Sequence, residues 1–109
     1  MADSNDAPIL SRFAEDPAEG EAVDAFVVGL AERVDALQDC EVRGALEALS
    51  ESLSALSEAA VKAGFDSLAR VADAVQRACG AGDADATRSG LIELTDTARR
   101  IRMGHRGAA

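Results

Sequence analysis

The sequence predicts an all-α fold, an up-down-up-down antiparallel four-helix bundle with a short N-terminal helical turn. Alanine, the strongest helix former, occupies 24 of 109 positions, and the chain holds only two prolines. Four segments carry apolar residues at helical spacing, and glycines separate them. A chain of this length builds one domain around one core. We expect a disordered N-terminus over 1–7, the bundle over 8–103 and a disordered tail over 104–109.

The N-terminal turn is expected over Pro8–Phe13, with its apolar side chains against the bundle. The first long helix is expected to start at Asp16, because Asp16, Pro17 and Glu19 have the order of a capping box. Gly44 is its predicted end, since glycine tolerates a left-handed cap, and a break near Asp39 is the alternative. Its apolar stripe consists of Val23, Phe26, Val27, Leu30, Val34 and Leu37.

The second helix, about Ala45 to Ala63, has the most regular pattern. Its predicted buried face consists of Leu46, Leu49, Leu53, Leu56, Ala60 and Ala63. A second stripe consists of Ser50, Ser54, Ser57 and Val61. At 100° per residue, Ser54 lies roughly 130° from the centre of the leucine face, so we expect it to face solvent.

Asp66 is the predicted cap of the third helix, which extends to about Cys79. Gly80–Asp83 is read as a tight turn, with Asp83 capping the last helix. The third helix is expected to bury Leu68, Val71, Ala72, Val75 and Ala78. The fourth is expected to bury Ala86, Gly90, Leu91, Leu94, Ala98 and Ile101, with Gly90 allowing close helix packing, and to fray from Gly104 onward.

Charge and composition argue against several classes of partner. The formal net charge is −9, which repels nucleic acid and anionic membrane surfaces. The chain has no Trp or Tyr on which bases could stack, and no run of 18 apolar residues. Cys40 and Cys79 form no C-x-x-C pair, so we interpret them as reduced thiols of a cytoplasmic protein.

No residue pattern predicts catalysis, a metal or a cofactor. The only histidine, His105, is expected in the tail, and one histidine with two distant cysteines makes no metal site. Neither of the glycine-rich phosphate-binding motifs is present. The carboxylates fall on polar helix faces, whereas a general acid needs an apolar or buried setting.

Three short pieces carry a resemblance to a known family. They are F-x-x-D-P at Phe13–Pro17, the break at Gly64-Phe65 and the turn at Ala81–Asp83. With these pieces in this order and at this spacing, the segment from about Ile9 to Arg102 resembles the histidine-containing phosphotransfer (HPt) domain family. The resemblance is closest to the stand-alone bacterial members of that family. The resemblance implies a four-helix bundle.

The family's chemistry lies in an H-x-x-K-G motif on the second helix, where the histidine accepts a phosphoryl group from a receiver aspartate. Counting back from Gly64-Phe65 places that motif on Ser54–Glu58. Ser54 then stands at the histidine position, Ser57 at the lysine position and Glu58 at the glycine position. The resemblance therefore implies the fold without the transfer chemistry.

The leading functional hypothesis is a non-catalytic HPt-like interaction module of a two-component phosphorelay, binding a receiver domain or a histidine-kinase domain. The expected contact surface is Ser50, Ser54, Ser57, Glu58, Val61 and Lys62. One alternative is active phosphotransfer through an atypical residue, with His105 as the only nitrogen candidate. Another is a bundle repurposed for self-association as a homodimer, or for an unrelated partner.

Overall fold

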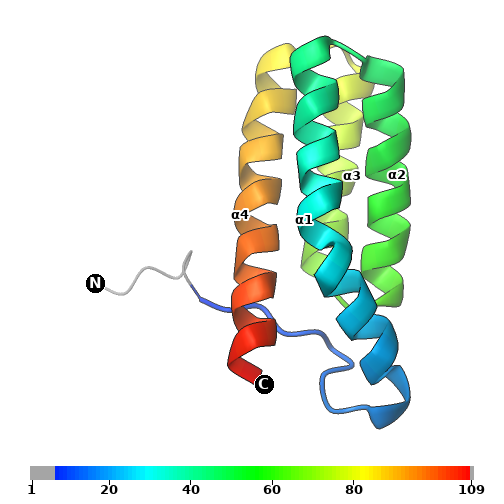
Figure 1. The fold of residues 1–109 in the computed structure, drawn as a ribbon. Helices are drawn as coiled ribbons and strands as arrows, with labels where there is room; N and C mark the ends of the chain where they lie inside the picture. The colour runs from blue at the N-terminus through cyan, green and yellow to red at the C-terminus, as the bar shows by residue number, and fades with distance from the viewer. Residues whose placement is uncertain (1–6, 109) are drawn as a thin grey trace.

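The computed structural model describes residues 7–108 and confirms the four-helix bundle (Figure 1). A 3-10 turn, η2 (Pro17–Glu19), leads into α1 (Gly20–Arg43). The remaining helices are α2 (Leu46–Lys62), α3 (Asp66–Gly80) and α4 (Ala84–Ala108). Neighbours along the chain pack side by side, and α1 closes the bundle against α4, so α2 lies diagonally opposite α4. The expected disorder of 1–7 falls almost wholly outside the described residues.

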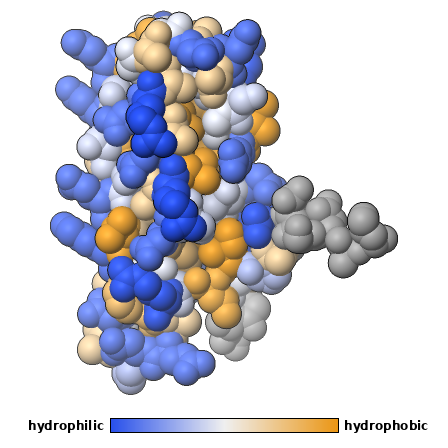
Figure 2. Space-filling view, turned by 180° about the vertical axis from the view of Figure 1, so that it is seen from behind, coloured by the Kyte–Doolittle hydropathy of each residue, from blue (hydrophilic) through white to orange (hydrophobic). Residues whose placement is uncertain are grey.

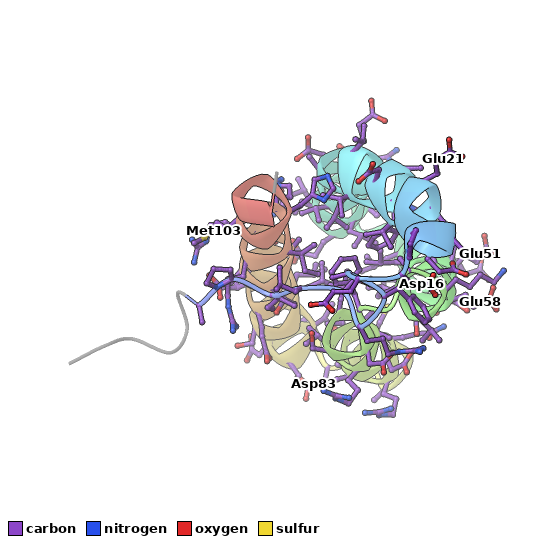
Figure 3. The ribbon with its side chains drawn as sticks, turned by 90° about the horizontal axis from the view of Figure 1, so that it is seen from below. Asp16, Glu21, Glu51, Glu58, Asp83 and Met103 are labelled. Atoms are coloured by element: carbon purple, nitrogen blue, oxygen red, sulfur yellow. The ribbon has the colours of Figure 1, made fainter. Side chains whose placement is uncertain are left out.

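The segment before η2 forms a strap rather than the predicted helical turn over Pro8–Phe13. Residues 8–11 have no helical structure, and the strap passes across the lower end of the bundle (Figures 1 and 3). The Ile9 amide donates to the Arg100 carbonyl at 3.0 Å, and the Arg12 amide donates to the Gly64 carbonyl at 2.9 Å. Because α4 and the α2–α3 turn accept these bonds, the strap has no need of a local helix.

The strap buries only part of its apolar surface. Ile9 and Phe13 pack against the core, as predicted. Leu10 instead remains 59% exposed. Viewed from behind, the surface is mostly hydrophilic, and apolar groups gather near the place where the strap passes α4 (Figure 2).

The start of the first helix is confirmed in outline and corrected in detail. The Asp16 carboxylate accepts the Ala18 amide at 3.0 Å, so Asp16 does cap this start. It caps the 3-10 turn, however, and Glu19 makes no side-chain cap bond, so no capping box forms. From Gly20, α1 runs unbroken past Asp39 and ends at Gly44, where φ is 70°.

The core follows the predicted apolar stripes, with corrections near the helix ends. Leu30, Leu49, Leu53, Leu68, Leu94 and Ile101 are fully buried. Leu46 is half exposed, since it is the first residue of α2, at the end of the bundle opposite the strap. Ala86 is exposed, and Thr87 takes the buried position one residue later in α4. Val71 and Ala78 lie at the edge of the core and are half-buried.

Helix α4 is longer than the sequence predicts, because the strap supports its last turns. It continues to Ala108, whereas we expected a disordered tail from Gly104. A Cβ atom added at Gly104 would lie 2.5 Å from the Ile9 carbonyl oxygen, so glycine allows the strap to cross α4 at this point. The Arg100 guanidinium also donates to the Ala7 carbonyl at 2.8 Å. Residue 109 lies outside the described chain.

Candidate functional site

The six residues predicted as a contact surface lie along one side of α2. Helical periodicity places the serines and Val61 in a single stripe, with Glu58 and Lys62 next to it. The three serines are half-buried, whereas Glu58, Val61 and Lys62 are exposed. We call this set the α2 stripe; it consists of Ser50, Ser54, Ser57, Glu58, Val61 and Lys62.

Helix α3 packs against α2 and reaches the stripe at Ser50. The Gln76 side-chain amide of α3 donates to the carbonyl and to the hydroxyl of Ser50, each at 3.3 Å. The α2–α3 pair is the most extensively packed in the bundle, which suits the small side chains of the stripe. Ser54, which we expected to face solvent, is half-buried and so keeps part of its surface exposed.

Negative charge surrounds Ser54 on its own helix. Glu51 precedes it by three residues and Glu58 follows it by four, the two spacings that bring side chains together on a helix. Both glutamates project away from the bundle along α2 (Figure 3). The nearest lysine in the sequence, Lys62, is exposed two turns further along. A phosphoryl group on Ser54 would therefore face two carboxylates of α2.

The strap brings a cation to the lower end of the α2 stripe, a contact that sequence reasoning missed. Arg12 forms an ion pair with Asp66 at 3.3 Å. Its guanidinium also donates to the Val61 carbonyl at 3.4 Å. Arg12 and Val61 are 49 residues apart, and no local signal in the sequence relates them. Gln76 was missed for the same reason, since only the packing of α3 against α2 brings it to Ser50.

The single histidine lies far from the stripe and within a helix. His105 belongs to α4, diagonally opposite α2, and not to a tail as predicted. Its side chain is 34% exposed, and its Nε2 lies 3.3 Å from Asp24 Oδ1 of α1. His105 therefore cannot serve as a base or as a phosphate acceptor at Ser54 without leaving α4.

The hollow under the strap does not involve the α2 stripe. It has a volume of about 390 Å³ and lies between the strap, the start of α1 and the end of α4. Its walls include Ile9, Phe13, Val23, Phe65 and Ile101.

Among residues 7–108, no three histidine, cysteine or carboxylate side chains are grouped so that they could hold a metal ion. Over the same range, no helix is both long and apolar enough to cross a membrane. No protein-family model, curated protein or solved structure matches the chain. The resemblance to the HPt family therefore stays a prediction from the sequence.

Proposed function

We propose that the chain is a non-catalytic HPt-like docking module of a two-component phosphorelay. In this proposal it binds a receiver domain or a histidine-kinase domain through the α2 stripe and accepts no phosphoryl group. The observation that carries the proposal is the serine at position 54, where the resemblance implies the phosphate-accepting histidine. The helical bundle and the location of Ser54 on the second helix support it.

The chemistry of Ser54 argues against transfer. A serine hydroxyl becomes a nucleophile only beside a general base, and among the described residues the one histidine lies across the bundle. Ser57 stands where the family has a lysine, so the cation that would neutralise the phosphoryl oxygens is missing there. Glu51 and Glu58 would repel those oxygens further. A receiver phosphate therefore finds neither an acceptor nor a counter-charge at this position.

The same features favour docking without chemistry. The serines are small, so a partner can approach the backbone of α2 closely, and Val61 adds an apolar group that is 44% exposed. Glu58 would repel the acidic phosphorylation pocket of a receiver, because contact between like charges at an interface is unfavourable. We therefore expect a receiver to bind in a pose shifted away from that pocket, or a kinase domain to present a less acidic surface.

A binding experiment tests the contact surface. The purified chain is titrated with receiver domains and histidine-kinase domains from the source cell, and affinity is measured by calorimetry. We expect Ser54→Arg to abolish binding without changing helical content, because the bulky side chain obstructs the α2 stripe. Ser89→Arg introduces the same side chain at an exposed position of α4 and should bind normally. Equal affinities for the two variants would contradict the proposed surface.

A transfer experiment tests the non-catalytic assignment separately. The chain is incubated with a phosphorylated receiver, and we expect no phosphoprotein. An acid-stable adduct lost in Ser54→Ala would indicate a serine ester. An acid-labile adduct lost in His105→Ala would indicate transfer through the histidine. Either adduct would replace this proposal with phosphotransfer through an atypical residue.

A further inference from the structure

The main chain of the strap is attached to the bundle at two separate places. At the first, the Ile9 amide donates to the Arg100 carbonyl of α4 at 3.0 Å. At the second, the Arg12 amide donates to the Gly64 carbonyl, between α2 and α3, at 2.9 Å. We call these two places the α4 anchor and the α2–α3 anchor. Both anchors are backbone hydrogen bonds that water could replace if the strap were lifted.

The strap places little apolar surface in the core. Among residues 7–16, Ser11 is the only buried one, and its hydroxyl donates to the Ala63 carbonyl. Ile9 and Phe13 are half-buried, and Leu10 is exposed. The largest fully buried side chains all belong to the four helices. Because the burial of apolar surface is the main stabilising force, the core holds the helices together but contributes little to holding the strap.

The strap is also incompletely packed against the bundle. The hollow of about 390 Å³ has Ile9 and Phe13 on the side of the strap, and Val23 and Phe65 on the side of the bundle. Side chains that face an open hollow contact less protein than side chains in a close-packed interior. Lifting the strap therefore sacrifices fewer contacts than separating two helices of the bundle.

Two glycines nevertheless fit the strap closely at its anchors. A Cβ atom added at Gly64 would lie 2.8 Å from Phe13 Cδ2, and one added at Gly104 would lie 2.5 Å from the Ile9 carbonyl oxygen. Gly64 has a φ of 84°, so its own backbone favours glycine. Gly104 lies within α4 and has no positive φ, and alanine would be the better helix former there. Position 104 thus favours the attached strap at the expense of helix propensity.

We propose that the strap is a latch that opens and closes as one unit while the four helices stay folded. In the closed state both anchors are formed, and the two glycines leave room for the strap. In the open state both anchors are released together, because Ile9 and Arg12 are only three positions apart. Local opening of this kind is expected of a segment with few buried apolar contacts and with backbone hydrogen bonds near the surface.

Opening the latch would change the lower end of α2 as well. Arg12 lies 3.3 Å from Asp66 and donates to the Val61 carbonyl at 3.4 Å, so it would leave both groups together with the strap. The α2 stripe, which includes Val61 and Lys62, would lose this neighbouring cation. The Phe65 wall of the hollow would become exposed to solvent. The latch stands on the contacts of the strap, and it holds whether or not the α2 stripe binds a phosphorelay domain.

Native-state hydrogen exchange of the full chain, followed by NMR at single amides in low concentrations of urea, tests the latch. We expect the Ile9 and Arg12 amides to exchange through one shared opening, more frequent than global unfolding and nearly insensitive to urea, since it exposes little surface. The Leu53 amide of the core should exchange only through global unfolding and respond steeply to urea. Strap amides that show the same urea dependence as Leu53 would overturn the proposal.

Gly104→Ala disturbs the α4 anchor alone and tests whether the two anchors open together. The clash with Ile9 should raise exchange at the Arg12 amide by the same factor as at the Ile9 amide, roughly tenfold or more. The matched control is Gly29→Ala, whose added Cβ atom meets nothing within 4 Å. It should slow exchange in the core and leave both strap amides unchanged, because their opening does not require the bundle to unfold.

Three results with Gly104→Ala would overturn the latch. Faster exchange confined to Ile9 would mean that the strap frays from one end and does not open as a unit. Faster exchange in the last turns of α4, with the strap amides unchanged, would mean that the helix yields to the clash and the strap stays attached. Unchanged exchange throughout would mean that the strap does not depend on the glycine at 104. Slower strap exchange in Gly29→Ala would also overturn it, by tying the opening to global unfolding.

Discussion

Two glycines inside helices provide a matched test of the packing, because the same substitution should act on them in opposite directions. Gly29 lies in α1, and a Cβ atom added there would meet nothing within 4 Å. Gly90 lies in α4, and the added Cβ atom would come within 2.6 Å of Val75 Cγ2. Val75 is only 1% exposed, so it has little space to yield.

The expected magnitudes follow from these contacts. Gly29→Ala gains the helix propensity of alanine without a clash and should stabilise the fold by about 0.5–1 kcal/mol. Gly90→Ala gains the same propensity, but overpacking a close-packed core typically costs about 1–3 kcal/mol. The net effect at Gly90 should therefore range from about neutral to a loss of about 2 kcal/mol. The two variants should differ by about 1–3 kcal/mol, close to the overpacking cost alone.

Urea unfolding followed by circular dichroism at 222 nm measures both variants in the same buffer. For a domain of this size, about 1 kcal/mol corresponds to a shift of roughly 4–8 °C in Tm, so thermal unfolding provides an independent reading. The denaturant slope m should stay unchanged if only the native state is affected. If Gly90→Ala stabilises the chain as much as Gly29→Ala, then α3 and α4 do not approach as closely as the structure describes.

Four further substitutions address the core, the strap and the histidine. Leu53→Ala should cost about 2–5 kcal/mol in urea unfolding because Leu53 is fully buried, whereas Leu10→Ala should change stability by less than about 0.5 kcal/mol. Ser11→Ala should cost about 1–3 kcal/mol, since the hydroxyl donates to the Ala63 carbonyl and accepts the Phe13 amide; a neutral result would refute the anchoring of the strap. His105→Ala should cost less than about 1 kcal/mol, because the Asp24 side chain that it contacts is 66% exposed, and a larger loss in Tm would show that the contact anchors α4.

The local pattern of the sequence determines much of the bundle. The spacing of Leu49, Leu53 and Leu56 predicts the buried face of α2, and all three are buried. The end of α1 at Gly44 follows from the conformational freedom of glycine. These features depend on residues within a few turns of one another, so periodicity and capping chemistry are sufficient to find them.

The larger errors arise where distant segments meet. The strap is no helix because α4 and the α2–α3 turn accept its amides, and α4 extends past Gly104 because the strap supports it. Helical periodicity places Ser54 well away from the centre of the leucine face, but it does not say on which side α3 packs. The half-buried state of Ser54 and the bond from Gln76 to Ser50 therefore depend on the pairing of helices.

The residue types at the α2 stripe are a property of the sequence alone: a serine at 54 and a glutamate at 58 limit the chemistry there in any fold. Their surroundings are a property of the tertiary structure, which brings Arg12 and Gln76 to the stripe and keeps His105 on the far helix. The physical reason is the distance along the chain over which each effect acts. Backbone propensity and capping act over a few residues, whereas the burial and charge of a side chain are set by whichever helices pack beside it.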